Sequence, residues 1–306
     1  MGKSTHFTGQ PLYCQLLNLT DKDLIKEMSR SGGHDHYVKK FDGYSHLVTL
    51  LYGVLMQHTS LREIVVGMLS DAHKLKHIGI NDIVKRSTLS DANNRRSSDF
   101  FSEVYFSLFN KYKTTLSDSV SSKPWEKLLH IMDSTTISLF SNILKGVGRH
   151  PKHGKKKGGI KVHTVLKATE GVPYSIHFTS AATHDHVMLK KLELSNGSFI
   201  AMDRAYIDYK VFEEFTQKGV FYVTKMKKNM KFESTKGHYL VNSNGLVVLK
   251  DSVIQLEKGD IKHTSRRIEY WEEGKKKSTV LLTNNLELDV NDVIEIYKRR
   301  WQIELL

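Results

Sequence analysis

The chain has 306 residues and carries 46 Lys and Arg against 33 Asp and Glu, which gives a formal net charge of +13. This excess favours a polyanionic partner, because each phosphate that a cation neutralises releases condensed counterions, although an anionic membrane surface would attract the same charge. The single cysteine, Cys14, excludes an internal disulfide and a cysteine-based metal site and fits a cytoplasmic location. No apolar run reaches the roughly 18 residues that span a bilayer, and we expect no membrane partner.

The length predicts about two domains, and the first of them is helical. Thr20 with Asp23, and Ser60 with Glu63, resemble capping boxes ahead of apolar positions, and a long apolar stretch between them predicts a buried helix. We therefore predict an all-α domain over residues 1–122. It is either a DNA-binding domain of the helix-turn-helix type or a helical cap without DNA contact, and the residues favour neither.

From about residue 123 onward the apolar residues alternate as they do in strands. In chain order we predict a strand that ends at Asp133, strands at 159–168 and 173–181, a helix at 186–194 and a strand that ends at Asp203. These are followed by a helix at 209–218 stopped by Gly219 and a strand at 221–227. The chain then continues with β hairpins at about 232–285, with an Asn244-Gly245 turn, and with a final helix that begins near Asp289 or Asn291. This order is that of an α+β, ribonuclease-H-like domain, a mixed sheet flanked by helices, with a β insertion.

In a fold of that kind, acidic groups from the first strand, the fourth strand and the last helix converge at one edge. Those places hold Asp133, Asp203 and Glu304. Three carboxylates suffice to hold two Mg²⁺ or Mn²⁺ ions about 3.5 to 4 Å apart, an arrangement that activates a nucleophile and stabilises charge during phosphodiester cleavage. The alternative reading of a single Asp at a strand end is a turn former or a helix cap.

The last helix carries a second set of candidates. At 100° per residue, Arg300 lies about 60° and Glu304 about 20° from Tyr297, so the three share one face. Glu304 can then point at the metals while the planar guanidinium of Arg300 binds a neighbouring phosphate. Trp301 could stack on an unpaired base. The alternative is an amphipathic helix with a Tyr-Arg-Glu surface patch.

The spacing Tyr297-x-x-Arg300-x-x-x-Glu304 resembles the signature of DDE transposases of the insertion-sequence-four (IS-four) family. "HIMDSTTISL" and "MDRAYIDY" resemble that family's first and second Asp segments. "GRHPKHGKKKGGIKVHTVL" resembles its basic loop and second strand, and "FYVTKMKKN" resembles the strand beyond the second Asp segment. "STHFTGQPLYCQLL" and "RSTLSDANNRRSSDFF" are similar to the helical domain that often precedes its catalytic core. The resemblance covers nearly the whole chain.

The resemblance implies catalytic and metal-binding roles for Asp133, Asp203 and Glu304, with Tyr297 and Arg300 assisting. It implies that water attack frees a 3′-hydroxyl at an element end and that this hydroxyl then attacks target DNA. The partners implied are double-stranded DNA, as element ends and target, and a second copy in a homodimer. The family's Lys, seven residues after the Glu, would fall beyond residue 306, so we expect a fragment or a truncated product of a DDE domain over residues 123–306. The alternatives are a catalytically inactive DNA-binding remnant and a nuclease without strand transfer.

Three further segments carry clustered basic residues or histidines. We predict phosphate contacts for two basic segments, made up of Arg149, Lys152, Lys155, Lys156 and Lys157, and of Lys225, Lys227 and Lys228. In "THDHV", His184 and His186 point apart on a helix, so a capped helix start is favoured over a metal site. The basic loop lacks the Ser or Thr of a phosphate-binding P-loop, and we expect no bound ATP.

Overall fold

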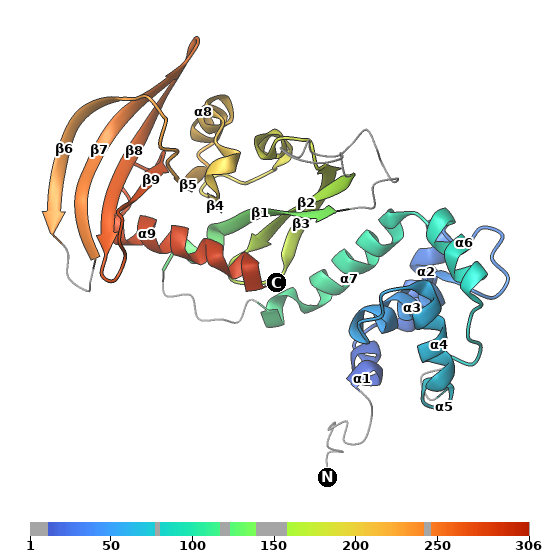
Figure 1. Cartoon of the computed structure of the whole chain (residues 1–306). Helices are drawn as coiled ribbons and strands as arrows, with labels where there is room; N and C mark the ends of the chain where they lie inside the picture. Colours follow the sequence, from blue (N-terminus) through green and yellow to red (C-terminus); the bar gives the residue numbers. More distant parts are fainter. Residues whose placement is uncertain (1–11, 77–79, 117–122, 139–157, 242–245, 306) are drawn as a thin grey trace. The chain divides into compact units, whose positions relative to one another are not determined.

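The computed structural model of the chain describes residues 12–76, 80–116, 123–138, 158–241 and 246–305. The chain divides into two compact units, residues 1–114 and residues 115–306 (Figure 1). The assignment of these units as a DNA-binding domain and a catalytic domain stays a prediction. No helix in the described ranges has the length and apolar character needed to cross a membrane.

The first unit is helical. Its helices are α1 (Leu12–Asn18), α2 (Lys22–Ser31), α3 (Gly43–Leu55), α4 (Leu61–Ser70), α5 (Ala72–Leu75), α6 (Arg86–Arg95) and α7 (Ser98–Leu116). They enclose one apolar core in which Val48, Leu89 and Phe100 are fully buried. The long apolar stretch predicted as a buried helix is α3, which supplies Tyr44, Val48 and Tyr52 to that core.

Two helix starts in this unit test the sequence reading. Ser60 caps α4, because its hydroxyl accepts a hydrogen bond from the backbone N–H of Glu63 at 3.2 Å. The prediction for α2 was wrong, since the cap is Asp21, whose carboxylate accepts from the N–H of Leu24. Thr20 cannot serve there because its hydroxyl donates to the carbonyl of Leu17 at 2.7 Å, at the end of α1.

In its described residues, the second unit is built on one nine-stranded sheet with the order β3-β2-β1-β4-β5-β9-β8-β7-β6. The strands are β1 (Leu129–Ser138), β2 (Gly159–Lys167), β3 (Pro173–Ser180), β4 (Phe199–Met202), β5 (Phe221–Lys225), β6 (Glu233–Val241), β7 (Leu246–Lys258), β8 (Ile261–Glu272) and β9 (Thr279–Thr283). Strands β1, β4 and β5 are parallel, and the remaining neighbours are antiparallel. The first five strands have the ribonuclease-H-like order, and the β insertion extends the same sheet.

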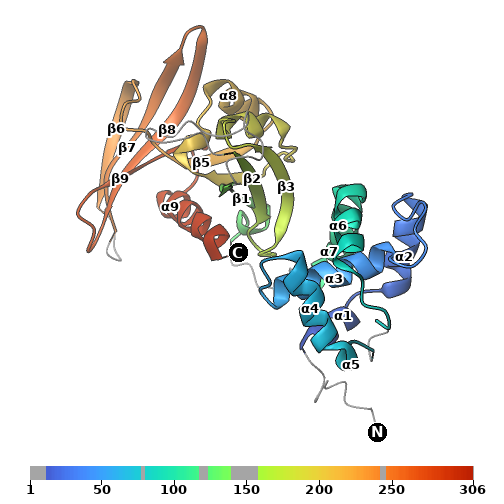
Figure 2. The same cartoon turned by 45° about the vertical axis from the view of Figure 1, so that its right-hand side comes forward.

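Two helices cover opposite faces of this sheet, α8 (Tyr209–Gln217) on one and α9 (Val290–Arg299) on the other (Figure 1, Figure 2). Successive strand residues point to opposite faces, so Met132 packs in the cluster that contains α8 while Ile131 packs in the cluster that contains α9. Both side chains are fully buried. The α+β fold predicted from the sequence is confirmed, with a core on each side of the sheet.

Three elements differ from their predicted form. Strand β1 continues past Asp133 to Ser138, because β2 offers it antiparallel partners as far as Gly159. The predicted helix at 186–194 is a 3₁₀ segment, η3 (Asp185–Lys191). A separate 3₁₀ segment, η2 (Glu126–Leu128), lies directly before β1. The final helix turns into the 3₁₀ segment η5 (Arg300–Leu305), so the 100° spacing used for its face ends at Arg299. The predicted turn at Asn244-Gly245 lies outside the described residues.

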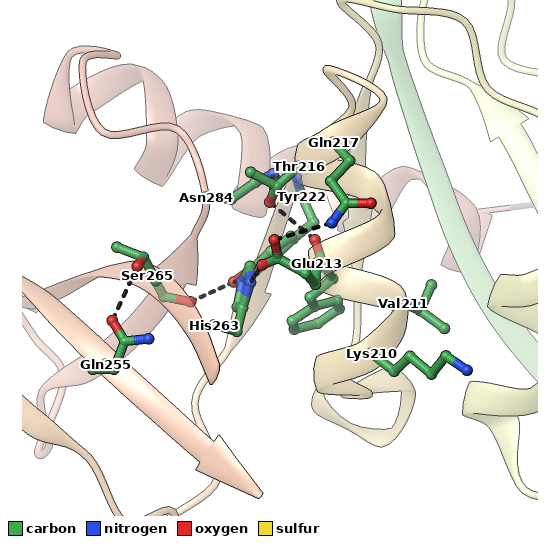
Figure 3. A network of polar contacts seen from close by, with 12 residues as sticks. Lys210, Val211, Glu213, Thr216, Gln217, Tyr222, Gln255, His263, Ser265 and Asn284 are labelled. Carbon is green, nitrogen blue, oxygen red and sulfur yellow. Dashed lines mark hydrogen bonds and ion pairs between the residues drawn. The ribbon is translucent and has the colours of Figure 1, made fainter. Parts of the chain in front are cut away.

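A buried polar network ties the β insertion to the rest of the sheet (Figure 3). His263 of β8 is fully buried, and its Nδ1 lies 3.0 Å from the Glu213 carboxylate of α8. Its Nε2 lies 2.9 Å from the hydroxyl of Tyr222 on β5, which also contacts Ser265 at 2.6 Å. Just after β9, the side chain of Asn284 accepts from the backbone N–H of Tyr222 at 2.9 Å. The insertion is therefore fixed to α8 and β5 by hydrogen bonds as well as by strand pairing.

This network makes stability depend on pH. Burial lowers the pKa of His263, against the opposing effect of Glu213, so in acid the unfolded chain takes up a proton more readily than the folded one. The free energy of unfolding should be highest above about pH 6.5 and should fall as the pH drops below that value. We expect His263→Gln to lower it by about 1–2 kcal/mol near neutral pH, through lost hydrogen bonds, and to flatten this decline.

Urea unfolding followed by tryptophan fluorescence between pH 5 and 8 measures this, because Trp125, Trp271 and Trp301 all lie in the second unit. His184→Gln, at an exposed position of the same unit, is the matched control and should keep the wild-type profile. A profile of His263→Gln as steep as that of the wild type would contradict the role given to His263.

Candidate active site

The two predicted aspartates lie side by side, Asp133 within β1 and Asp203 directly after the end of the neighbouring parallel strand β4. Met132 of β1 pairs with Met202 of β4, so Asp133 and Asp203 follow side by side. In each, one carboxylate oxygen, Oδ1, accepts a hydrogen bond from the next backbone N–H, that of Ser134 or of Arg204, at 2.7 Å. This shared local geometry fixes one oxygen of each carboxylate to the backbone.

Arg300 joins Asp133 to the end of the chain. Its Nη1 donates to Oδ2 of Asp133 at 3.1 Å, and its Nη2 donates to Oε1 of Glu304 at 3.2 Å. The guanidinium lies 5.9 Å from the centre of the Tyr297 ring. The Arg300 side chain is 15% exposed, and its buried Nε has no hydrogen-bond partner in the described part of the chain. The predicted trio Tyr297, Arg300 and Glu304 thus meets beside Asp133, although Glu304 lies on η5 and not on an α-helix.

The charges of these groups act on one another. Burial raises the pKa of Asp133, and the negative charges of Asp203 and Glu304 raise it further, while the Ser134 N–H and Arg300 oppose them. Burial would lower the pKa of Arg300, but its pKa is raised overall by Tyr297 and by the carboxylates of Asp133, Asp203 and Glu304. The positive charge is therefore stabilised by all three carboxylates.

Tyr297 belongs to the same electrostatic group. Its pKa is raised, mainly by burial, with Arg300 lowering it and Asp203 raising it. Its hydroxyl therefore remains protonated at neutral pH and can donate a hydrogen bond. All five residues predicted to be catalytic interact here, and their individual roles stay predictions.

The predicted DNA-binding residues, unlike the five predicted catalytic residues, do not all gather at one place in the described structure. Trp301 is 61% exposed on η5. Lys225 ends β5 and Lys228 is exposed. Burial lowers the pKa of Lys227, as do the charges of Lys258 and Arg204, while Asp203 raises it. Arg204 and Lys258 were not among the basic residues that the sequence predicted near the site, although Arg204 directly follows Asp203. Arg149, Lys152, Lys155, Lys156 and Lys157 lie outside the described residues.

The "THDHV" motif was read wrongly as a capped helix start. His184 precedes η3 without making a side-chain capping hydrogen bond. The Asp185 side chain instead contacts Lys161 at 3.0 Å and accepts from the hydroxyl of Ser134 at 2.9 Å. Polar residues at alternate positions of β2, Lys161 and His163, were the sequence signal for a buried polar partner.

The donor set at the sheet edge fits a hard divalent cation in its chemistry. Asp133, Asp203 and Glu304 supply only carboxylate oxygens, the ligands that Mg²⁺ and Mn²⁺ prefer. Burial, with smaller contributions from the charges of Asp203 and Glu304, raises the pKa of Asp133, and Arg300 supplies positive charge beside it. Within the described ranges, no three His, Cys, Asp or Glu side chains are grouped closely enough to enclose a metal ion.

Comparisons with known proteins identify the family of the chain. The family model described as a transposase DDE domain matches residues 124–306, and one described as a domain of unknown function (DUF4372) matches residues 8–81. A Sinorhizobium fredii protein named as a transposase (y4zB) is 27% identical over 223 residues, covering 71% of this chain and 60% of the relative. A Synechocystis protein named as a transposase for insertion sequence element IS4SA is 27% identical over 236 residues, covering 74% and 61%.

The chain therefore spans about 60% of the length of the curated relatives it matches. Among solved structures, the piggyBac transposase synaptic complex with hairpin DNA aligns over 97% of this chain and 67% of that chain, with a TM-score of 0.40 and 10% identity.

Removing the positive charge of Arg300 should destabilise the second unit. In Arg300→Met, three carboxylates that are partly shielded from solvent would lose their shared partner, so we expect the free energy of unfolding to fall by about 1–3 kcal/mol in urea at pH 7 and low salt. Arg299→Met is the control, because Arg299 pairs with Glu126 and Glu295 but its side chain is 37% exposed. Equal stability of Arg300→Met and wild type would show that the carboxylates do not need Arg300.

Proposed function

The chain belongs to the transposase DDE domain family, and from that premise we propose that it cuts the ends of an insertion sequence and joins their 3′-hydroxyl groups to target DNA. The observation that carries this proposal is the meeting of Asp133, Glu304 and Arg300 beside Asp203. Carboxylates from two strands and a terminal segment, converging at one sheet edge, suit a reaction at a phosphodiester.

Asp133, Asp203 and Glu304 would hold the divalent cations, Mg²⁺ or Mn²⁺, two in number. Two such ions, when bound, lower the pKa of the attacking hydroxyl group and neutralise charge that develops at phosphorus. The contribution of the protein is to fix the direction of the carboxylates. Oδ1 of each aspartate is held by a backbone N–H, which leaves Oδ2 of Asp203 outside that bond and Oδ2 of Asp133 on Arg300.

Arg300 would bind DNA phosphate during the reaction. Its planar guanidinium already forms two separate hydrogen bonds to carboxylates, and the same geometry matches two phosphate oxygens. Tyr297, kept as a neutral phenol by its raised pKa, would orient Arg300 and donate a hydrogen bond near Asp203. Both groups therefore position the scissile phosphate.

The remaining contacts would hold the DNA on either side of the site. Lys227 lies within electrostatic reach of Asp203, so phosphate bound by Lys225, Lys227 and Lys228 would lie next to the carboxylates. Trp301, exposed on the segment that carries Arg300 and Glu304, would stack on an unpaired base. The basic segment with Arg149, Lys152, Lys155, Lys156 and Lys157 is proposed to add phosphate contacts, the helical unit to bind the element end, and a second copy to bind the other end.

Cleavage and joining can be measured with Mg²⁺ and labelled DNA from the ends of the element that encodes the chain. We expect Asp133→Ala, Asp203→Ala and Glu304→Ala each to lower both activities by at least about 100-fold, because each removes a carboxylate that the phosphoryl chemistry needs. Glu287→Ala, at an exposed position on the loop before α9, should retain both.

The products separate the alternatives. Nicked DNA without joined product would identify a nuclease. DNA binding without any cleavage would identify an inactive DNA-binding protein and overturn the proposal.

The salt dependence of DNA binding tests the lysine contacts. The triple variant Lys225→Ala, Lys227→Ala and Lys228→Ala should weaken binding and reduce the slope of log K against log salt by up to about 3, since each lost phosphate contact removes roughly 0.9 from that slope. The control removes the same charge from the exposed loop between β8 and β9, at Lys275, Lys276 and Lys277. An equal change in both triple variants would show that only net charge matters.

A further inference from the structure

The face of the sheet opposite Asp133 carries a polar network close to both aspartates. Side chains alternate along β1, so Asp133 faces α9 and the next residue, Ser134, faces the other core. The Ser134 hydroxyl donates to Oδ1 of Asp185 at 2.9 Å. Asp185 is the first residue of η3, and its side chain is 16% exposed.

Lys161 gives Asp185 a fixed charge partner. The Lys161 side chain is 6% exposed, and its Nζ lies 3.0 Å from Oδ1 of Asp185 and 2.8 Å from the carbonyl oxygen of Thr183. Burial alone would raise the pKa of Asp185, but the hydrogen bonds from Lys161 and Ser134 lower it overall. An ammonium so deeply buried is costly unless it is paired, so the two charges hold each other in place.

His163 carries the network to the second aspartate. It is fully buried, pairs with Ser134 across β1 and β2, and has its Nδ1 4.0 Å from Oδ1 of Asp185. The same Nδ1 lies 3.2 Å from the hydroxyl of Tyr206, which also interacts with the Ser134 hydroxyl. Tyr206 is 1% exposed and ends η4 (Arg204–Tyr206), the short turn that Asp203 begins.

The Asp185 network, defined as Ser134, Lys161, His163, Asp185 and Tyr206, therefore touches the residue after Asp133 and the turn after Asp203. The two aspartates carry like charge, so their side chains do not hold each other. The pairing of β1 with β4 ends at Met132 and Met202, so Asp203 lies just beyond the last residue that strand pairing holds beside β1. The Asp185 network is placed to fix the spacing beyond that point, because it binds both segments from behind the sheet.

We propose that Asp185 is a positioning residue, which with Lys161 fixes the spacing of Asp133 and Asp203 and thereby their affinity for a divalent cation. The part of this inference that concerns the cation rests on the proposed function. Groups that orient metal-binding side chains without touching the metal commonly alter metal affinity by 10- to 100-fold when they are removed. Asp185 acts on the two aspartates indirectly, through Ser134 and through the turn that contains Tyr206.

A purely structural role predicts a different result. If Asp185 and Lys161 were only a buried ion pair, replacing both by uncharged residues would leave stability nearly unchanged or improved, and cation binding would not change. Asp185→Ala alone does not separate the two readings, because it leaves Lys161 buried without its partner. The double variant Lys161→Met and Asp185→Ala does, because it removes both charges together with the acceptor for Ser134.

The experiment measures Mn²⁺ binding to the DNA-free chain by calorimetry, thermal unfolding, and amide hydrogen exchange. We expect the double variant to unfold near the wild-type temperature, to bind Mn²⁺ at least about 10-fold more weakly, and to exchange faster at residues 129–138 and 199–206. Asp185→Asn keeps an oxygen acceptor for Ser134 and should lose less affinity. The control is Arg266→Met with Asp251→Ala, an ion pair between β7 and β8 with side-chain exposures of 11% and 13%, which should leave Mn²⁺ binding unchanged.

A folded double variant that binds Mn²⁺ as tightly as the wild type overturns the proposal. If the wild type itself binds no Mn²⁺, the metal chemistry of the proposed function fails, and hydrogen exchange then decides the positioning role by itself. Faster exchange at both segments in the double variant, and not in the control, supports that role. Unchanged exchange overturns it.

Discussion

The site depends on one interaction, the contact of the Arg300 guanidinium with carboxylates that repel one another. Arg300 donates to Asp133 and to Glu304 and also responds to the charge of Asp203. Without a cation at this edge, three negative charges partly shielded from water would be brought together by the fold with no compensation. The packing of α9 against the sheet brings Arg300 there, because Val293 and Ile294 are buried in the same core as Ile131 of β1.

The alternation of side chains along β1 separates two tasks. One face presents Asp133 to Arg300, and the other presents Ser134 to Asp185. The charged edge and the network behind it are thus built from adjacent residues of one strand, and each has its own apolar core beneath it. The β insertion is joined to the same sheet, since β9 pairs with β5 and His263 bonds to Tyr222.

The sequence predicts the elements that depend on local pattern. The sequence of strands along the chain, the position of Asp203 directly after β4, and the cap of α9 at Asp289 all follow from periodicity and capping residues. The contacts of Asp185 could not be predicted in this way, because Lys161 reaches it from a separate strand and the motif around Asp185 reads locally as a helix start. The extension of β1 beyond Asp133 has the same cause, since its partner strand β2 decides where it ends. For the candidate site, the sequence supplied the five residues, and only the structure gives the pairing of Arg300 with both Asp133 and Glu304.

The central claim is that Asp133, Asp203 and Glu304 form one cation site, with Arg300 supplying the positive charge between them. A crystal structure of the chain soaked in Mn²⁺, with anomalous scattering recorded, measures this directly. The account predicts anomalous density bounded by the three carboxylates, with Arg300 no longer bonded to Asp133. Saturating Mn²⁺ that gives no anomalous density at this edge, with Arg300 still paired to Asp133 and Glu304, would contradict it.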